Sequence, residues 1–62
     1  MARLNISINL DNAAFNGDYL AREYEIERAL HHIAEQIFAG DTARAVIDTN
    51  GNNCGNFEIL ED

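Results

Sequence analysis

The residues best suited to hold a metal ion are one histidine and two glutamates. Glu27, His31 and Glu35 follow one another at intervals of four, which places them in one row along a helix. A zinc site requires three or four nitrogen, sulfur or oxygen ligands, and the single cysteine, Cys54, lies far from this row in sequence. The simpler interpretation is that the two carboxylates hold His31 on a solvated helix surface. We therefore expect no metal site and no cofactor.

A second candidate is the segment 48–52, Asp-Thr-Asn-Gly-Asn, which matches the first, third and fifth positions of a calcium-binding loop. The match then ends, because Asn53 stands where the loop needs glycine and Ile59 stands where it needs a bidentate glutamate. A hairpin turn explains the Asn-Gly pair without any ion, since glycine supplies the positive φ that tight turns need. We expect a turn here.

No group of residues in the sequence forms a catalytic site. Cys54 has no histidine or basic residue close to it that could activate its thiol. Ser7 lies in a strand-like segment without a nucleophile-elbow pattern, and the sequence contains no glycine-rich phosphate loop. The sequence therefore predicts a protein that is not an enzyme.

A second apolar stripe on the expected helix favours binding to a partner. At 100° per residue, Leu20, Tyr24 and Phe38 lie about 120–160° away from Ile26, whereas a helix on a small sheet needs an apolar arc of only about 100°. The stripe is either an interface or part of a helix sunk deeply into its own core, with Phe38 folded over the sheet edge. The predicted partner-binding residues are Leu20, Tyr24, Glu27, His31, Glu35 and Phe38.

The elements that must position these residues follow from the hydrophobic pattern. Apolar and polar residues alternate over residues 3–10, which indicates a strand with Leu4, Ile6, Ile8 and Leu10 facing the core. Helical spacing follows over about 19–39, with Asp18 as an acceptable N-cap and Gly40 as a natural C-terminal stop. The helix face expected to pack against the core comprises Tyr19, Ile26, Ala29, Leu30, Ile33 and Ile37.

The remaining sequence predicts a hairpin and a small core. Residues 44–48 and 54–60 have the composition of two strands, and they are joined by a turn over 49–53. Gly55 within the second strand indicates a bulge or a close contact, and Phe15 is expected to plug the top of the core. The predicted fold is α+β, in the order β-α-β-β, with a three-stranded antiparallel sheet and one amphipathic helix packed on one face.

Length and charge restrict the class of protein further. Sixty-two residues allow a single domain, 1–62, whose core is small enough that self-association is expected to supplement it. The net charge of −7 and four scattered arginines argue against direct binding to nucleic acid. The acidity either imitates DNA or serves solubility. The sequence contains no long apolar run and no cysteine pair, so we expect no membrane partner and a cytoplasmic protein.

The hairpin pattern Asp-x-Asn-Gly-Asn-x-x-Gly-x-Phe-Glu, over residues 48–58, is the most specific part of the sequence. Together with the patterns over residues 6–15 and 26–37, it resembles small acidic proteins encoded by phages and prophages. Proteins of this group are mostly of unknown function, so the resemblance transfers no site residues. It implies a protein that acts stoichiometrically on a host protein, as anti-CRISPR and other anti-defence inhibitors do.

These observations predict a homodimeric, non-enzymatic protein that binds and inhibits a host protein, such as a nucleic-acid-binding defence protein, in the host cytosol. The alternative is a structural or assembly protein of a phage particle or of its replication machinery. The two differ in the class of partner, which the sequence does not identify.

Overall fold

The computed structural model describes residues 1–11, 13–16 and 21–61. Its elements, in chain order, are β1 (Arg3–Ile8), a short 3-10 turn η1 (Ala13–Phe15), α1 (Ala21–Phe38), β2 (Ala43–Ile47) and β3 (Asn53–Leu60). The expected α+β class and the β-α-β-β order are both confirmed. The predicted N-cap Asp18 and the helical positions Tyr19 and Leu20 lie outside the described residues.

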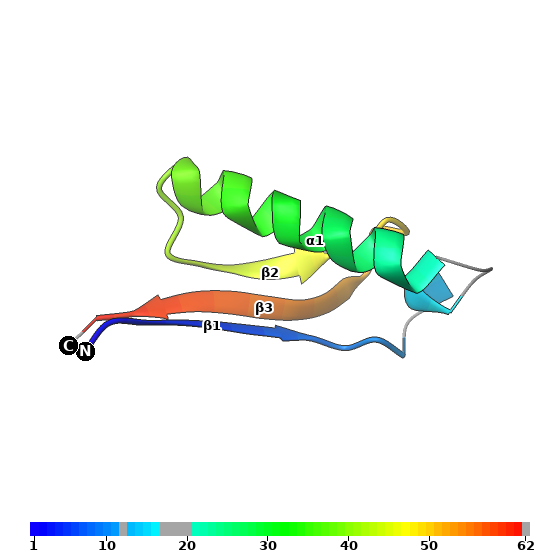
Figure 1. The fold of residues 1–62 in the computed structure, drawn as a ribbon, viewed down its shortest axis with the longest axis horizontal. Helices are drawn as coiled ribbons and strands as arrows, with labels where there is room; N and C mark the ends of the chain where they lie inside the picture. The colour runs from blue at the N-terminus through cyan, green and yellow to red at the C-terminus, as the bar shows by residue number, and fades with distance from the viewer. Residues whose placement is uncertain (12, 17–20, 62) are drawn as a thin grey trace.

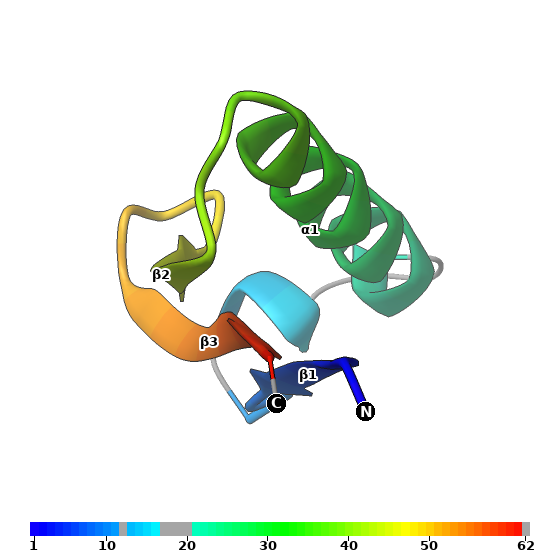
Figure 2. The ribbon, with the colours of Figure 1, turned by 90° about the vertical axis from the view of Figure 1, so that its left-hand side faces the viewer.

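The three strands form one antiparallel sheet in the order β1-β3-β2, so the last strand of the chain lies in the middle. In this register Leu4 stands opposite Ile59, and Ile6 opposite Phe57. Opposed residues point to the same face of a sheet, so the apolar side of β1 faces the same way as Phe57. Helix α1 lies across that face on the side of β2, as the view along the sheet shows (Figures 1 and 2).

The core is compact and lies beneath α1, on the β2–β3 side of the sheet. Phe57 from β3 and Phe15 from η1 are its largest fully buried side chains, which confirms the expected position of Phe15. The complete buried cluster is Phe15, Ala29, Ile33, Val46, Cys54 and Phe57.

Two expectations about the core are corrected. Leu30 is 45% exposed, because burial on α1 is centred on the row Glu25, Ala29 and Ile33, and Leu30 stands at the edge of that row. On β1, Leu4 is 48% exposed and Ile6 is 40% exposed although both face the helix side. The helix lies next to β2, and β1 is the strand farthest from it (Figure 1), so these two side chains stay exposed.

Glycines determine how the connections are made. Gly51 has a φ of 85°, and its N–H donates to the carbonyl of Asp48 at 3.0 Å, which closes the β2–β3 hairpin as the sequence predicted. Gly40 has a φ of 108° and follows the end of α1, where the N–H of Asp41 donates to the carbonyl of Gln36 at 3.0 Å. This bond is typical of a helix that ends at a left-handed glycine.

The sequence predicted a bulge or a close contact at Gly55, and the structure has a bulge beside this residue as well as a close contact to it. The pairing of β2 with β3 shifts its register between Val46 and Ile47, which leaves Cys54 as the extra residue of a bulge. On the other side of β3, a Cβ atom built on Gly55 would overlap the carbonyl oxygen of Ser7. The backbones of β1 and β3 therefore approach each other more closely here than any other residue type permits.

Candidate functional site

The two sides of α1 have different surroundings, and a hydrogen bond of Arg28 identifies the side that faces β2. Its Nη2 atom donates to the carbonyl of Ile47 at 2.9 Å, so this side of the helix faces β2. Leu30 follows two positions later, a rotation of about 200°. It therefore lies on the opposite side of α1, which faces away from β2 and overhangs the uncovered strand β1.

This open side of α1 contains a shallow hollow of about 430 Å³. Ile26 and Leu30 supply its apolar surface, and the polar residues of the lining are Glu23, Glu27 and His31. Ile26 also packs against the buried cluster, so it is held in place from beneath. The hollow therefore combines a supported apolar floor with two carboxylates and an imidazole around it.

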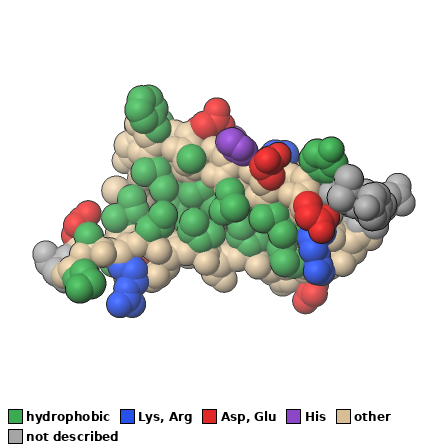
Figure 3. Space-filling view, in the orientation of Figure 1, with side chains coloured by type: hydrophobic (Ala, Val, Ile, Leu, Met, Phe, Trp, Pro, Cys, Tyr) green, Lys and Arg blue, Asp and Glu red, His purple; other side chains and the backbone are tan. Residues whose placement is uncertain are grey.

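Across the open side, β1 contributes the exposed residues Leu4 and Ile6. Seen from this side, hydrophobic side chains form a continuous band between α1 and β1, with acidic and histidine side chains along the helix above it (Figure 3). A band of this kind on so small a protein is typical of an interaction surface, because soluble monomers seldom expose extended apolar patches. We refer to Leu4, Ile6, Ile26 and Leu30 as the open apolar side.

The structure separates the predicted partner-binding residues into groups. Glu27 and His31 both line the hollow. Tyr24 and Phe38 are exposed, Phe38 to 95%, but neither lines it. The exposure of Phe38 removes the alternative in which it folds over the sheet edge. Glu35 is exposed elsewhere on α1, and Leu20 lies outside the described residues.

The expectation that both Glu27 and Glu35 hold His31 is wrong for Glu35. Glu35 lies beside His32 instead, with 3.7 Å between its Oε1 atom and the Nδ1 atom of the imidazole. Both side chains are largely exposed, so such a contact contributes little to stability. Among the described residues, no three histidine, cysteine, aspartate or glutamate side chains are grouped as a metal site requires.

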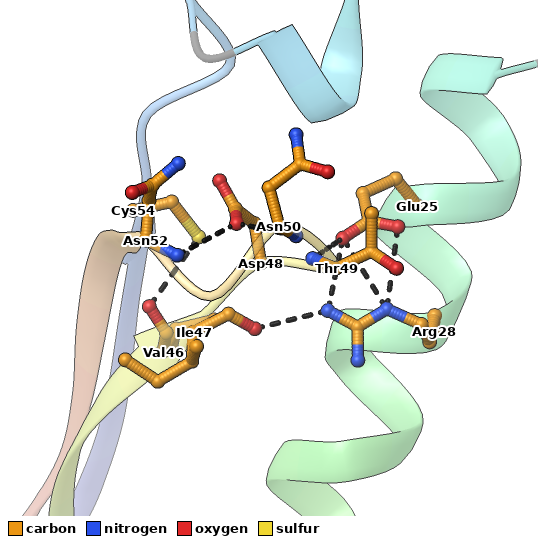
Figure 4. Close-up of polar contacts among 9 residues, drawn as sticks. All are labelled: Glu25, Arg28, Val46, Ile47, Asp48, Thr49, Asn50, Asn52 and Cys54. Carbon is orange, nitrogen blue, oxygen red and sulfur yellow. Dashed lines mark hydrogen bonds and ion pairs between the residues drawn. The ribbon is translucent and has the colours of Figure 1, made fainter.

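Glu25 is a buried acid on α1 with partners in the helix and in the hairpin (Figure 4). Its carboxylate accepts hydrogen bonds from Arg28 Nη2 at 2.9 Å and from the backbone N–H of Thr49 at 2.8 Å. The hydrogen bond from Arg28 holds the pKa of the Glu25 carboxyl below its ordinary value, although burial opposes this shift. The cluster joins α1 to the hairpin and has a structural role.

Glu25 was not among the residues expected to be buried. Its spacing of four from Ala29 and eight from Ile33 would have shown it, because these three residues share one helical row. An acid in a row with buried apolar residues must have a partner. Here Arg28, three positions later, is that partner.

Asp48 accounts for the part of the sequence that resembles a calcium loop. Its Oδ1 atom accepts the backbone N–H groups of Asn50 and Asn52, each at 2.9 Å (Figure 4). The carboxylate thus organises the hairpin turn from within, as aspartate does in Asx turns. The segment 48–52 therefore forms the hairpin turn that we expected from the sequence.

Cys54 is a buried residue of β3, in the bulge opposite β2. Its thiol donates a hydrogen bond to the carbonyl of Val46 at 3.4 Å, and burial raises the pKa of the thiol. A thiol with a raised pKa holds little of the reactive thiolate. These properties are those of a packed core residue.

Comparisons with protein-family models, with curated proteins and with solved structures gave no match. Within the described ranges, no helix has the length and apolarity needed to cross a membrane.

Proposed function

We propose that the protein acts by binding another protein through its open apolar side, and that it inhibits a host protein stoichiometrically in the host cytosol. The observation that carries this proposal is the exposure of Leu4, Ile6 and Leu30 along one uncovered side of the fold. Burying such residues against a partner releases water from apolar surface, which is the main driving force of association.

The chemistry of the hollow indicates what the partner presents. Ile26 and Leu30 suit an apolar side chain, and Glu23 and Glu27 stand beside them. A partner with an apolar anchor flanked by arginine or lysine fits this arrangement, because the carboxylates then pair with its basic groups at the rim. The net charge of −7 attracts such a partner over longer range.

Basic surfaces with these properties are common on proteins that bind nucleic acid. The proposal therefore favours a nucleic-acid-binding defence protein of the host as the target, in agreement with the phage-type resemblance. Inhibition then follows from occupation of the basic surface, without any reaction catalysed by this chain.

The experiment compares two leucines of nearly equal exposure. Leu30 lies in the hollow and is 45% exposed, whereas Leu60 lies on the opposite face of the sheet and is 44% exposed. Wild type, Leu30→Asp and Leu60→Asp are immobilised, and the proteins that each retains from a host-cell extract are quantified by mass spectrometry. Thermal unfolding verifies that both variants are folded.

A target protein should be retained by the wild type and by Leu60→Asp and lost with Leu30→Asp. With the purified target, we expect the dissociation constant to rise at least tenfold for Leu30→Asp, since a carboxylate then stands in an apolar contact. Equal retention by all three proteins would contradict the proposed surface. A capsid, tail or replication protein as the target would favour the structural alternative over the inhibitor.

A further inference from the structure

The two edges of the sheet are unequally protected. The order β1-β3-β2 places β1 and β2 at the edges. Helix α1 lies beside β2, where Arg28 donates to the carbonyl of Ile47. In the part of the chain that the structure describes, no strand or helix lies along the outer edge of β1 (Figures 1 and 2). The edge of β1 is therefore open to another strand.

The hydrogen bonds of β1 show which backbone groups are available. The N–H of Asn9 donates to the carbonyl of Cys54, which places Asn9 on the side of β1 that pairs with β3. Backbone groups of alternate residues point to opposite sides of an antiparallel strand. The N–H and C=O groups of Leu4, Ile6 and Ile8 therefore point away from β3, toward the open edge.

Nothing in the sequence of β1 discourages pairing along this edge. Natural edge strands avoid association through prolines, bulges or charges that point inward. The strand, Arg-Leu-Asn-Ile-Ser-Ile, has no proline and a single charge, at Arg3, and its pairing with β3 continues without a bulge. None of the 11 acidic residues of the chain lies in β1, so pairing along this edge places no two carboxylates of β1 opposite each other.

We propose that two copies of the chain pair through β1, antiparallel, with Ile6 of one copy opposite Ile6 of the other across a two-fold axis. The backbone groups of Leu4 and Ile8 then bond to those of Ile8 and Leu4 of the second copy. One continuous sheet runs through both copies, and the exposed apolar residues of the two β1 strands lie next to each other. This surface differs from the helix stripe of Tyr24 and Phe38 that the sequence favoured.

The charges at the two ends of the segment favour this arrangement. Arg3 stands at the start of β1, and Asp11 follows its end. In the antiparallel pair, Arg3 is opposite Asn9 of the second copy, whose Oδ1 atom accepts the N–H of Asp11 in the turn that follows β1. The carboxylate of that Asp11 therefore lies near the end of the strand that the long Arg3 side chain meets. The two-fold axis generates this contact twice. A parallel arrangement would place like charges together.

The test is a charge-swap cycle measured by analytical ultracentrifugation. Arg3→Glu and Asp11→Arg should each raise the dimer dissociation constant about tenfold, because each replaces two attractive contacts by repulsive ones. The double variant should return to within about threefold of the wild type. Arg3 begins β1 and Asp11 lies in the turn beyond its far end, and the strand between them is roughly 17 Å long, so recovery requires contact between copies.

Arg44→Glu is the matched control, since it changes the net charge as Arg3→Glu does but lies on β2, where Arg44 pairs with Asp41 of its own chain. We expect its dissociation constant to stay within about threefold of the wild type. A double variant as weak as either single variant would overturn the proposal, as would a wild type that is monomeric at millimolar concentration.

A second pair of variants tests the backbone directly. Ile6→Pro removes an N–H that points away from β3, so the sheet of one copy keeps its hydrogen bonds, whereas the pair between copies loses two. Ile6→Ala shortens the same side chain and keeps the N–H. Ile6→Pro should weaken the dimer at least tenfold more than Ile6→Ala does. Equal effects of the two variants would overturn pairing through this edge.

Discussion

The carboxylate of Glu25 accepts the backbone N–H of Thr49 at 2.8 Å, across 24 residues of sequence. This bond joins the N-terminal half of α1 to the tip of the β2–β3 hairpin. Arg28 completes the connection, because it donates both to Glu25 and to the carbonyl of Ile47. The position of the helix on the sheet thus depends on one ion pair as well as on the core.

Removal of this carboxylate should destabilise the fold. We expect Glu25→Ala to lower the free energy of unfolding by about 2 kcal/mol, because Thr49 loses its acceptor and Arg28 its partner. Urea denaturation followed by circular dichroism measures the change. Glu27→Ala, on the exposed side of the same helix, is the control and should change the stability by less than about 0.5 kcal/mol. Equal effects of the two variants would contradict the structural role of Glu25.

The same group predicts a dependence of stability on pH. The pKa of Glu25 is lowered in the folded state, chiefly by the hydrogen bond from Arg28, so folding favours the charged form. Its contribution is therefore complete above its ordinary pKa near 4.5 and is lost as the pH falls through the lowered value. The stability difference between wild type and Glu25→Gln should narrow as the pH falls from 6 to 3. A difference that is independent of pH would contradict this prediction.

Gly51 and Gly55 should respond differently to the same substitution. Gly51→Ala should cost about 1 kcal/mol, because alanine is strained at a φ of 85° although nothing lies within 4 Å of the added Cβ. Gly55→Ala should cost about 3 kcal/mol, because the methyl group overlaps the carbonyl of Ser7 and forces β1 away from β3. Thermal unfolding of both variants shows which substitution lowers the stability more. A larger loss at Gly51 would be inconsistent with the close approach of the two strands.

The predictable parts of the fold are those that depend on local sequence. The alternation in β1, the turn glycine Gly51 and the helix stop at Gly40 each specify a backbone conformation within a few residues. The pairing of β1 with the last strand also followed, because a compact sheet leaves few other arrangements. These features needed no knowledge of how the helix is rotated.

The less predictable parts depend on that rotation. The apolar pattern placed Leu30 in the core, but the helix turns the row of Glu25 and Ala29 toward the sheet. In this orientation Glu25 accepts the N–H of Thr49, and Arg28 donates to the carbonyl of Ile47. Leu30 consequently moves to the open side and becomes part of the hollow. Hydrophobic periodicity gives the width of an apolar face and does not show which half of it the sheet covers.

The thiol of Cys54 should be almost unreactive in the folded protein. Burial raises its pKa, and the thiol donates to the carbonyl of Val46, so little thiolate is available to a disulfide reagent. We expect labelling at neutral pH to be at least a hundredfold slower than in urea. Destabilisation by Glu25→Ala should accelerate it. Rapid labelling of the native wild type would show that this part of the core is open.

Substitutions of Phe38 and Phe57 should differ strongly in their effect on stability, because the two aromatic residues lie at the extremes of exposure. Phe38 is 95% exposed at the end of α1, whereas Phe57 is fully buried in β3. Phe38→Asp should therefore change the free energy of unfolding by less than about 0.5 kcal/mol. Phe57→Ala should cost about 4 kcal/mol because it leaves a cavity in a small core. Chemical denaturation measures both.

The oligomeric state of Phe38→Asp then distinguishes the two surfaces on which a dimer could form. A dimer through β1 leaves Phe38 uninvolved, so light scattering should give the same mass for Phe38→Asp as for the wild type at equal concentration. A dimer through the helix stripe of Tyr24 and Phe38 would instead dissociate, because a carboxylate would stand in an apolar contact. Tyr24→Asp is the companion variant and should behave in the same way as Phe38→Asp. Monomers from both variants, with β1 unchanged, would assign the interface to α1 and contradict pairing through the sheet edge.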